Sequence, residues 1–421
     1  MKKTYIDTAM ERIAPDLILK GGNVVDVFSG RVIKADVIIK DGIICGVGSY
    51  SGENEQDVSG KYVMPGFIDS HVHIESSMTQ PSEYAKAVMP HGITTVIADP
   101  HEITNVCGED GLEFMLKSAK NIPLDVNLML PSCVPATPFE HTGANLDAKT
   151  TQKLAPKFFG IGEMMNYPGI VSGDDETLGK LCLDIIDGHA PLLSGHELDA
   201  YTSAGIKTDH ECSVVEEMTE KISKGMYILL REGTLSLDVA KLIKGVTPYT
   251  LRRCAFCTDD RFVGEIIRDG SIDHCIRKAV SLGLNNIDAI IMATLNACEM
   301  YGMKNKGAIA PSYVADIVVA DDLNLSSISQ VYKNGKLVCE NGTALFECET
   351  VDNSKVTNTV HLPKISADFF KTDVKDKFDA IELIPESIIT KKVTVSYSDS
   401  LSKVCVIERH HNLGTKGIGF V

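Results

Sequence analysis

The sequence has no long hydrophobic run, no cluster of basic residues and no N-terminal leader. No stretch of the 421 residues approaches the apolar length of a membrane helix, and Met1 to Asp16 lack the apolar segment of a signal peptide. The net charge is -16, from 41 basic and 57 acidic residues, so the surface repels phosphate backbones and anionic membranes. These absences predict a cytoplasmic protein that binds neither nucleic acid nor membrane.

Paired cysteines are also scarce. The 12 cysteines are scattered singly from Cys45 to Cys405, apart from the close pair Cys254 and Cys257. A zinc ribbon needs a second such pair, so we interpret the cysteines as reduced thiols. The chain is nevertheless rich in hydrophobic residues, at 44%, spread along its length. That content predicts one large core and a smaller one, and it excludes a disordered chain.

The spacing of the apolar segments predicts a (β/α)8 barrel. From Val63 to about Met303, short apolar strands alternate with helix-like stretches, as in a parallel sheet with crossover helices. Eight such units in about 240 residues match a closed barrel of the TIM type. The eight strands are expected near Phe67, Val96, Val126, Ile161, Ile185, Ile206, Ile228 and Ala255.

Short strands on both sides of the barrel predict a flanking β-sheet. Residues 16–50 read as strands separated by Gly21-Gly22, Ser29-Gly30 and Asp41-Gly42, which is typical of hairpins in a small antiparallel sheet. Two strand patterns between residues 315 and 338 are expected to pair with them. Further strands near Val393–Tyr397 and Val404–Glu408 predict a separate unit that stops before it is complete. The expected domains are flanking strands in 1–62, the barrel in 63–305, flanking strands in 306–360 and an incomplete C-terminal unit in 361–421.

Histidines and acids follow six of the eight expected strands. The C-terminal strand ends build the active site of such barrels, and a barrel without one would seldom carry so many. His71 and His73 alternate along the end of a strand, so both imidazoles can face one site. Two histidines and a carboxylate with open positions suit a metal that activates water. The polar residues at the strand ends are His71, His73, Asp99, His101, Glu102, Glu163, His189, His210, Arg231, Asp259 and Asp260.

The motifs around these residues resemble one enzyme family. Met64-Pro65-Gly66-Phe67-Ile68-Asp69-Ser70-His71-Val72-His73 is similar to the first metal motif of the amidohydrolase superfamily. The continuation Ile74-Glu75-Ser76-Ser77-Met78 narrows the resemblance to the adenine deaminase branch. Further similar motifs are Ala98-Asp99-Pro100-His101-Glu102-Ile103, Gly162-Glu163-Met164-Met165-Asn166, Asp187-Gly188-His189-Ala190-Pro191, Thr208-Asp209-His210-Glu211 and Thr258-Asp259-Asp260-Arg261.

The resemblance implies hydrolytic deamination of adenine to hypoxanthine and ammonia, in purine salvage, at a two-metal site. His71, His73 and Asp259 would hold the first metal. His189 and His210 would hold the second, with Glu163 as the bridge. Imidazole and carboxylate ligands admit iron, manganese and zinc, and the family implies manganese or iron. Asp259 is expected to shuttle protons, with Glu163 as the second catalytic residue.

Several roles and alternatives stay open at this stage. Asp99, His101 and Glu102 are expected to bind the purine, but they could instead support the first metal, form an extra metal site or hold a loop together. Arg231 is interpreted as part of a structural Arg–Glu pair and Asp260 as a cap of the next turn.

Two other functions also remain open. The first is another amidohydrolase, which would act on cyclic amides or N-acetyl groups. Members of the adenine deaminase branch continue well past the point matching Val421, so the second is a truncated and catalytically impaired homologue. The family commonly self-associates, which leaves a homo-oligomer open.

Overall fold

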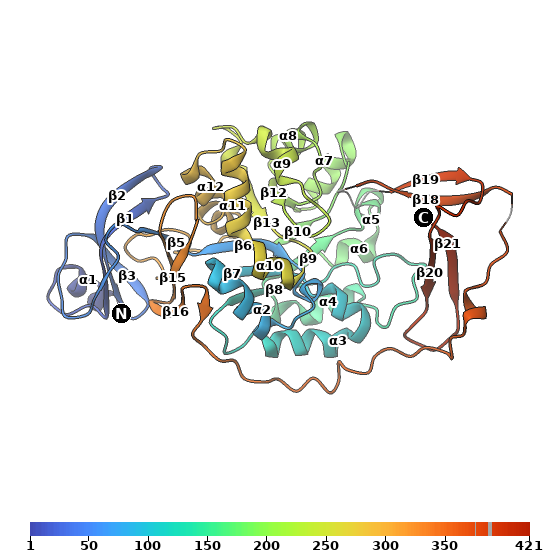
Figure 1. The fold of residues 1–421 in the computed structure, drawn as a ribbon, viewed down its shortest axis with the longest axis horizontal. Helices are drawn as coiled ribbons and strands as arrows, with labels where there is room; N and C mark the ends of the chain where they lie inside the picture. The colour runs from blue at the N-terminus through green and yellow to red at the C-terminus, as the bar shows by residue number, and fades with distance from the viewer. Residues whose placement is uncertain (375, 386–389) are drawn as a thin grey trace.

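The computed structural model describes residues 1–374, 376–385 and 390–421. A barrel lies at the centre of the molecule, with a β-sheet at one end and β-hairpins at the other (Figure 1). In the described residues, no helix is both long enough and apolar enough to cross a membrane.

Eight parallel strands form the barrel within residues 67–257, which confirms the predicted fold class. Five are hydrogen-bonded in the order β10-β9-β8-β7-β6 and three in the order β11-β12-β13. A parallel bridge between Val72 and Asp259 joins the end of β6 to the residues after β13. The strands are β6 (Phe67–Val72), β7 (Ile93–Ala98), β8 (Asp125–Leu130), β9 (Gly160–Met164), β10 (Ile186–Gly188), β11 (Thr208–Asp209), β12 (Tyr227–Arg231) and β13 (Cys254–Cys257).

The barrel strands are apolar because helices cover their outer faces. All six residues of β7, Ile-Thr-Thr-Val-Ile-Ala, are buried, as expected of a parallel strand covered on both sides. Helix α11 buries Ile272, Cys275, Ile276 and Ala279, which recur on one face at helical spacing. The helices after the barrel strands are α2 (Pro81–Val88), α3 (His101–Ser118), α4 (Ala148–Leu154), α5 (Tyr167–Ser172), α6 (Asp175–Gly179), α7 (Gly195–Ser203), α8 (Val215–Ser223), α9 (Val239–Leu242), α10 (Val263–Asp269), α11 (Ile272–Ser281), α12 (Asn286–Met292) and α13 (Leu295–Met300).

The flanking sheet has nine strands over residues 17–344 and combines segments from both sides of the barrel. Its hydrogen-bonded order is β17-β16-β15-β14-β5-β1-β2-β3, with β4 also paired to β1. A short helix, α1 (Lys2–Ala9), precedes it. The strands are β1 (Leu17–Asp26), β2 (Arg31–Lys40), β3 (Ile43–Gly48), β4 (Glu55–Asp57), β5 (Tyr62–Pro65), β14 (Ile317–Ala320), β15 (Ile328–Lys333), β16 (Lys336–Glu340) and β17 (Thr343–Ala344).

Within residues 16–50 the predicted antiparallel pairing is confirmed, because β1 pairs antiparallel with β2 and β2 with β3. Strands β4 and β5, which lie beyond that range, run parallel to β1. One detail of the predicted N-terminal strands is wrong. Gly21-Gly22 does not form a turn but shifts the register inside the single strand β1. Gly21 has a φ of 72° there and its N–H donates to Asp36 Oδ1 at 2.8 Å. Glycine permits this conformation in a bulge as well as in a turn, so the local sequence did not separate the two.

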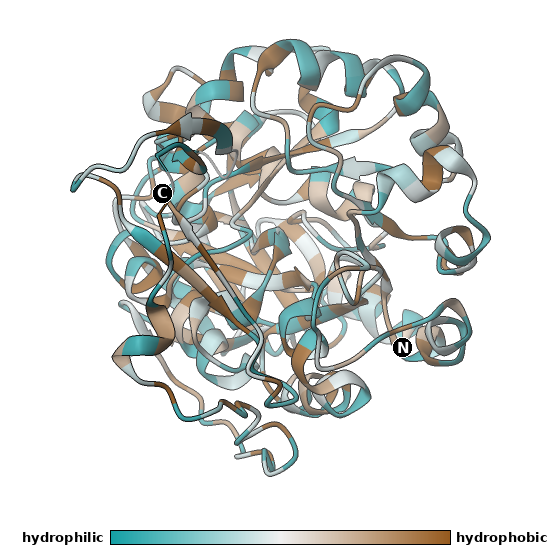
Figure 2. Cartoon of the chain, turned by 90° about the vertical axis from the view of Figure 1, so that its right-hand side faces the viewer, coloured by the Kyte–Doolittle hydropathy of each residue, from teal (hydrophilic) through white to brown (hydrophobic). Residues whose placement is uncertain are grey.

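The C-terminal part forms two hairpins beside the barrel. The first pairs β18 (Phe378–Leu383) with β19 (Thr390–Val395), and the second pairs β20 (Lys403–Ile407) with β21 (Lys416–Phe420). The Phe420 ring packs 4.7 Å from the Phe378 ring and connects the two hairpins. Figure 2 views the molecule from the end that carries the hairpins. Hydrophobic strands of the barrel lie in the interior behind the hairpins, and the helices around the barrel carry many hydrophilic segments.

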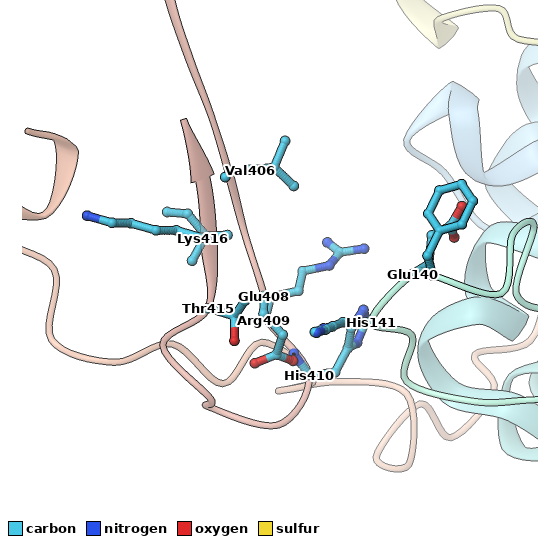
Figure 3. Close-up of a pocket in the computed structure, with 11 residues that line it drawn as sticks. Glu140, His141, Val406, Glu408, Arg409, His410, Thr415 and Lys416 are labelled. Atoms are coloured by element: carbon cyan, nitrogen blue, oxygen red, sulfur yellow. Dashed lines mark hydrogen bonds between the residues drawn. The ribbon is translucent and has the colours of Figure 1, made fainter. Parts of the chain in front are cut away.

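The second hairpin approaches a loop that follows β8. His411 Nε2 lies 3.0 Å from the carbonyl oxygen of Thr142. Nearby, Glu140 and His141 face Glu408 and His410 across a cavity of 480 Å³ (Figure 3). The C-terminal hairpins are therefore close to the barrel end that carries the polar strand ends.

Candidate active site

The six residues assigned to metals converge at the carboxyl ends of the barrel strands. β6 delivers two histidines, and β9, β10, β11 and β13 deliver one group each at or just beyond their ends. Overlapping sets of these side chains have ligand atoms within 4.8 Å of one another. Five of the six are buried, and His189 is half-buried. The six residues are His71, His73, Glu163, His189, His210 and Asp259.

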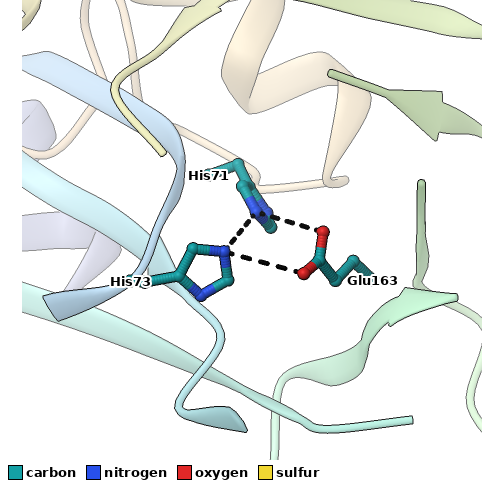
Figure 4. Close-up of side chains that lie close together, drawn as sticks. All are labelled: His71, His73 and Glu163. Atoms are coloured by element: carbon teal, nitrogen blue, oxygen red, sulfur yellow. Dashed lines mark hydrogen bonds and ion pairs between the residues drawn. The ribbon is translucent and has the colours of Figure 1, made fainter. Parts of the chain in front are cut away.

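His71 and His73 turn their Nε2 atoms toward each other. His71 Nδ1 lies 3.4 Å from Asp187 Oδ2, and His73 Nδ1 lies 2.9 Å from the carbonyl oxygen of Asp99. These acceptors require an N–H on each Nδ1, so both neutral rings present an Nε2 lone pair. The two Nε2 atoms lie 3.1 Å apart (Figure 4). Facing lone pairs repel, and a cation bound by both would relieve that repulsion.

The Glu163 carboxylate spans two groups of imidazoles. Its Oε2 lies 2.8 Å from His189 Nδ1 and 3.0 Å from His210 Nε2. Its Oε1 faces the other side, 3.7 Å from His73 Nε2. Burial alone would raise the pKa of Glu163, but the imidazoles of His189 and His210 hold that pKa well below its usual value. An ionised carboxylate with one oxygen toward each group of histidines is suited to bridge two cations.

Asp259 faces the same histidines with one oxygen and an arginine with the other. Its Oδ1 lies 3.1 Å from His73 Nε2, while Arg231 Nη1 donates to its Oδ2 at 2.8 Å. Burial alone would raise the pKa of Asp259, but neighbours that include His73 and Arg231 lower it well below its usual value. Its φ of 56° lies in the left-handed region, which aspartate tolerates better than most residues. Backbone strain of this kind is often found at active sites.

Arg231 contacts more acids than the predicted structural pair. Besides Asp259, its guanidinium binds Glu211 and Asp238, with Nε donating to Asp238 Oδ2 at 3.1 Å. It therefore holds the Asp259 carboxylate in place from the side that faces away from His73. Asp260 does not cap the following turn as predicted. The structure gives it a hydrogen bond from the Ser76 hydroxyl, and α10 begins later, at Val263.

The three residues assigned to the purine lie in different surroundings. Asp99 is fully buried, and its Oδ2 accepts the N–H of Glu163 at 2.9 Å. His101 Nδ1 lies 3.4 Å from Glu163 Oε1, inside the histidine cluster. Burial alone would lower the pKa of His101, but Asp99 and Glu102 raise it to about 10. Of the three, Glu102 lines the open pocket described next.

A pocket of 300 Å³ opens beside Asp259 and Arg231. Three exposed apolar side chains line it, those of Met78, Leu235 and Phe262. Its polar lining includes Ser76, Glu102 and Asp260. The pocket can hold a small aromatic ring, with apolar groups for its faces and carboxylates and a hydroxyl for its edges. Sequence reasoning did not assign Met78, Leu235 or Phe262 to the pocket, because they come from separate loops and their apolar side chains carry no chemistry that marks a site.

The donor set suits a pair of divalent transition metals. Four imidazoles and two carboxylates are the ligands that such ions take in water-activating sites. The fixed tautomers of His71 and His73 and the two-sided Glu163 carboxylate fit two ions better than one.

Comparison with known proteins identifies the family of the chain. The model of the amidohydrolase family matches residues 62–338. An adenine deaminase of Clostridium acetobutylicum is 47% identical over 99% of this chain, and adenine deaminase 2 of Desulfotalea psychrophila is 44% identical over 100% of it. The chain spans 76% of the length of each relative. A solved β-aspartyl dipeptidase from Fervidobacterium islandicum AW-1 shares the fold, with a TM-score of 0.57 at 20% identity, covering 80% of this chain and 99% of that one. The chain therefore belongs to the amidohydrolase family, in its adenine deaminase branch.

Proposed function

We propose that this chain deaminates adenine by hydrolysis, producing hypoxanthine and ammonia for purine salvage. The observation that carries the proposal is the pocket beside Asp259, in a chain that aligns over almost its whole length with adenine deaminases. Its apolar lining and polar edge groups match a purine base, which has two apolar faces and hydrogen-bonding edges.

The six converging residues would hold two divalent ions. His71, His73 and Asp259 would bind the first, His189 and His210 the second, and Glu163 both. Manganese or iron is our assignment, and zinc also suits these ligands. Two such ions would lower the pKa of water held between these residues, so that hydroxide would be available near neutral pH.

Protein groups then orient the base and move protons. Phe262, Leu235 and Met78 contact the faces of the ring, while Glu102 accepts a hydrogen bond from a purine N–H. Water adds at C6 while one of its protons passes through Asp259 to the ring nitrogen N1, which leaves a tetrahedral carbon that carries a hydroxyl and the amino group. Asp259 then moves the hydroxyl proton to the amino group, and the C6–N bond breaks as C6=O forms, so that hypoxanthine and ammonia result. Arg231 holds the second oxygen of Asp259, so the first stays directed at the reacting atoms.

The decisive experiment is an assay of the purified chain after loading with Mn²⁺. We expect adenine to be consumed with equal yields of hypoxanthine and ammonia. Dihydroorotate and N-acetylglucosamine 6-phosphate serve as comparison substrates for cyclic-amide and N-acetyl hydrolysis. Hydrolysis of either one, with adenine left intact by the metal-loaded protein, would contradict the proposed function.

We also propose a cytoplasmic location. The cysteines, all within the described ranges, are free thiols, which suits a reducing compartment. A homo-oligomer is proposed from the family, and the mass in solution by light scattering would test it.

A further inference from the structure

Two neighbouring barrel strands are joined by side chains at the point where two of the proposed ligands emerge. β10 and β11 belong to different hydrogen-bonded sheets. Across this seam, the Gly188 N–H donates to Thr208 Oγ1 at 2.9 Å and the Ala190 N–H donates to Asp209 Oδ1 at 2.8 Å. His189 lies between the two donor residues, Gly188 and Ala190, and His210 directly follows Asp209. The seam therefore sets the distance between the two histidines.

A fully buried lysine binds atoms on both sides of this seam. Lys221 reaches it from α8 and has no exposed surface. Its Nζ donates to Asp209 Oδ2 at 3.0 Å, to the Ala190 carbonyl oxygen at 2.6 Å and to Glu217 Oε1 at 2.7 Å. An ammonium has three N–H donors, and these three bonds use all of them. Lys221 and Asp209 together thus hold both the N–H and the carbonyl of Ala190, the residue after His189.

Glu217 extends the connection to both loops. Its Oε1 accepts the Leu192 N–H at 2.7 Å, in the loop after β10. Its Oε2 accepts the Ser213 N–H at 3.3 Å, in the loop after β11. The three charged side chains therefore link the backbone after His189, at Ala190 and Leu192, to the backbone after His210, at Ser213.

Stability alone is a weak reason for such a cluster. Taking charges out of water is costly, and a buried ion pair often contributes less stability than apolar residues of the same volume. What the cluster gives is fixed geometry, because its bonds hold Asp209 and Ala190, which directly adjoin His210 and His189, and the loops that follow the two histidines. Groups that orient metal ligands typically change metal affinity about 10- to 100-fold when they are removed.

We propose that Lys221, with Asp209 and Glu217, is a positioning residue that sets the separation of His189 and His210 and so the affinity of the second metal. This inference rests on the two-metal assignment of the proposed function. The ligands specific to the first metal are His71 and His73, at the end of β6, and Asp259, just after β13. All three lie outside this cluster. Removing the lysine should therefore weaken one site and spare the other.

The test measures metal binding rather than activity. Wild-type protein and Lys221→Met are stripped of metal, titrated with Mn²⁺ and analysed for bound ions per chain. We expect wild type to bind two ions. We expect Lys221→Met to keep the first affinity within about twofold and to lose about tenfold or more in the second. Lys224→Met is the matched control, because Lys224 lies just after α8 and pairs with Asp199 at the surface; it should bind as wild type does.

A second variant covers the case in which Lys221→Met fails to fold. Glu217→Gln keeps the size of the side chain and its acceptor oxygen but removes the charge opposite Lys221, so it should weaken the second site in the same direction and by less. If folded Lys221→Met binds two ions with wild-type affinities, the inference is overturned. If Lys221→Met does not fold, the same result from Glu217→Gln overturns it. An equal loss of affinity at both metal sites would also overturn it. A wild-type protein that binds fewer than two ions would overturn the two-metal proposal itself.

Discussion

Glu163 differs from the other acids at the barrel mouth because both of its oxygens face histidines. Glu163→Gln keeps the shape and replaces one oxygen with an amide nitrogen that donates instead of accepting. We predict loss of at least one bound metal and a fall in adenine turnover of about 100-fold or more. Elemental analysis and the ammonia assay measure the two effects. Glu197→Gln, at an exposed position of α7, is the control. Full metal content and full rate in Glu163→Gln would show that this carboxylate is not the bridge.

Phe262 is the aromatic residue in the proposed purine pocket, and the residue is about half exposed, at 48%. Stacking of a base on an aromatic ring contributes about 1–3 kcal/mol. Phe262→Ala should therefore raise the KM for adenine by about 10-fold or more and leave kcat nearly unchanged. Steady-state kinetics of metal-loaded protein separates the two constants. Tyr249→Ala removes a 90% exposed aromatic side chain and should change neither. An unchanged KM in Phe262→Ala would place the base elsewhere.

The histidines were predictable because each lies at or just beyond the end of an expected barrel strand. His71 and His73 alternate at the end of β6, and His189 and His210 follow β10 and β11. The structure brings all four together with Glu163 and Asp259. The apolar lining of the pocket was not predictable, because Met78, Leu235 and Phe262 meet only through the tertiary fold, whereas Glu102 was expected to bind the purine. Arg231 was interpreted as a structural residue, since nothing in its local sequence shows that Asp259 lies beside it.

At the scale of elements, the barrel and the flanking sheet are joined by buried charges. Lys333, on β15, binds both oxygens of Asp316 at 2.9 Å and Asp125, the first residue of β8, at 2.9 Å. Lys306 binds Asp125 as well, and its Nζ lies 3.1 Å from Asp316. This cluster fixes the sheet against the end of the barrel opposite to the proposed active site.

Lys333→Met should lower stability without changing the chemistry. It leaves the buried Asp316 with a weaker set of partners, and breaking a buried pair costs about 3–5 kcal/mol in the free energy of unfolding. Circular dichroism during urea unfolding measures the loss. Lys61→Met disrupts an exposed pair with Asp321 and should cost far less. If the two variants unfold at the same urea concentration, the buried cluster does not stabilise the junction.

Barrel strands were easier to predict than strands of the flanking sheet. Each barrel strand is short and mostly buried and is followed by a helix, and each contains or begins within two residues of its expected position. In β1, by contrast, two glycines were interpreted as a turn although the strand continues through them. Turns and bulges use the same residue type, so pairing with distant strands decides between them.

On the scale of the whole molecule, a long connection separates the flanking sheet from the C-terminal hairpins. Residues 345–366 lie mostly outside helices and strands and run along the barrel surface near α3 (Figure 1). Many of their side chains are exposed, and Lys355 is tied to Asp110 by a surface ion pair. Such pairs contribute little to stability.

Limited proteolysis should therefore begin in this connection. We expect early cleavage between residues 349 and 366 and a resistant fragment that contains the flanking sheet and the barrel, because exposed chain without regular structure is cut first. Mass spectrometry of the fragments locates the cuts. First cuts inside the barrel strands would contradict this description of the molecule.

The most direct test of a two-metal adenine deaminase is the dependence of activity on bound metal. Metal-free protein is titrated with Mn²⁺, and ammonia release from adenine is measured at each step. Six ligand side chains, one of which is the bridging carboxylate, would hold two ions. We therefore predict that the rate rises until two ions are bound per chain and then stays constant. A rate that saturates at one ion per chain, or adenine turnover by the metal-free protein, would contradict the two-metal site.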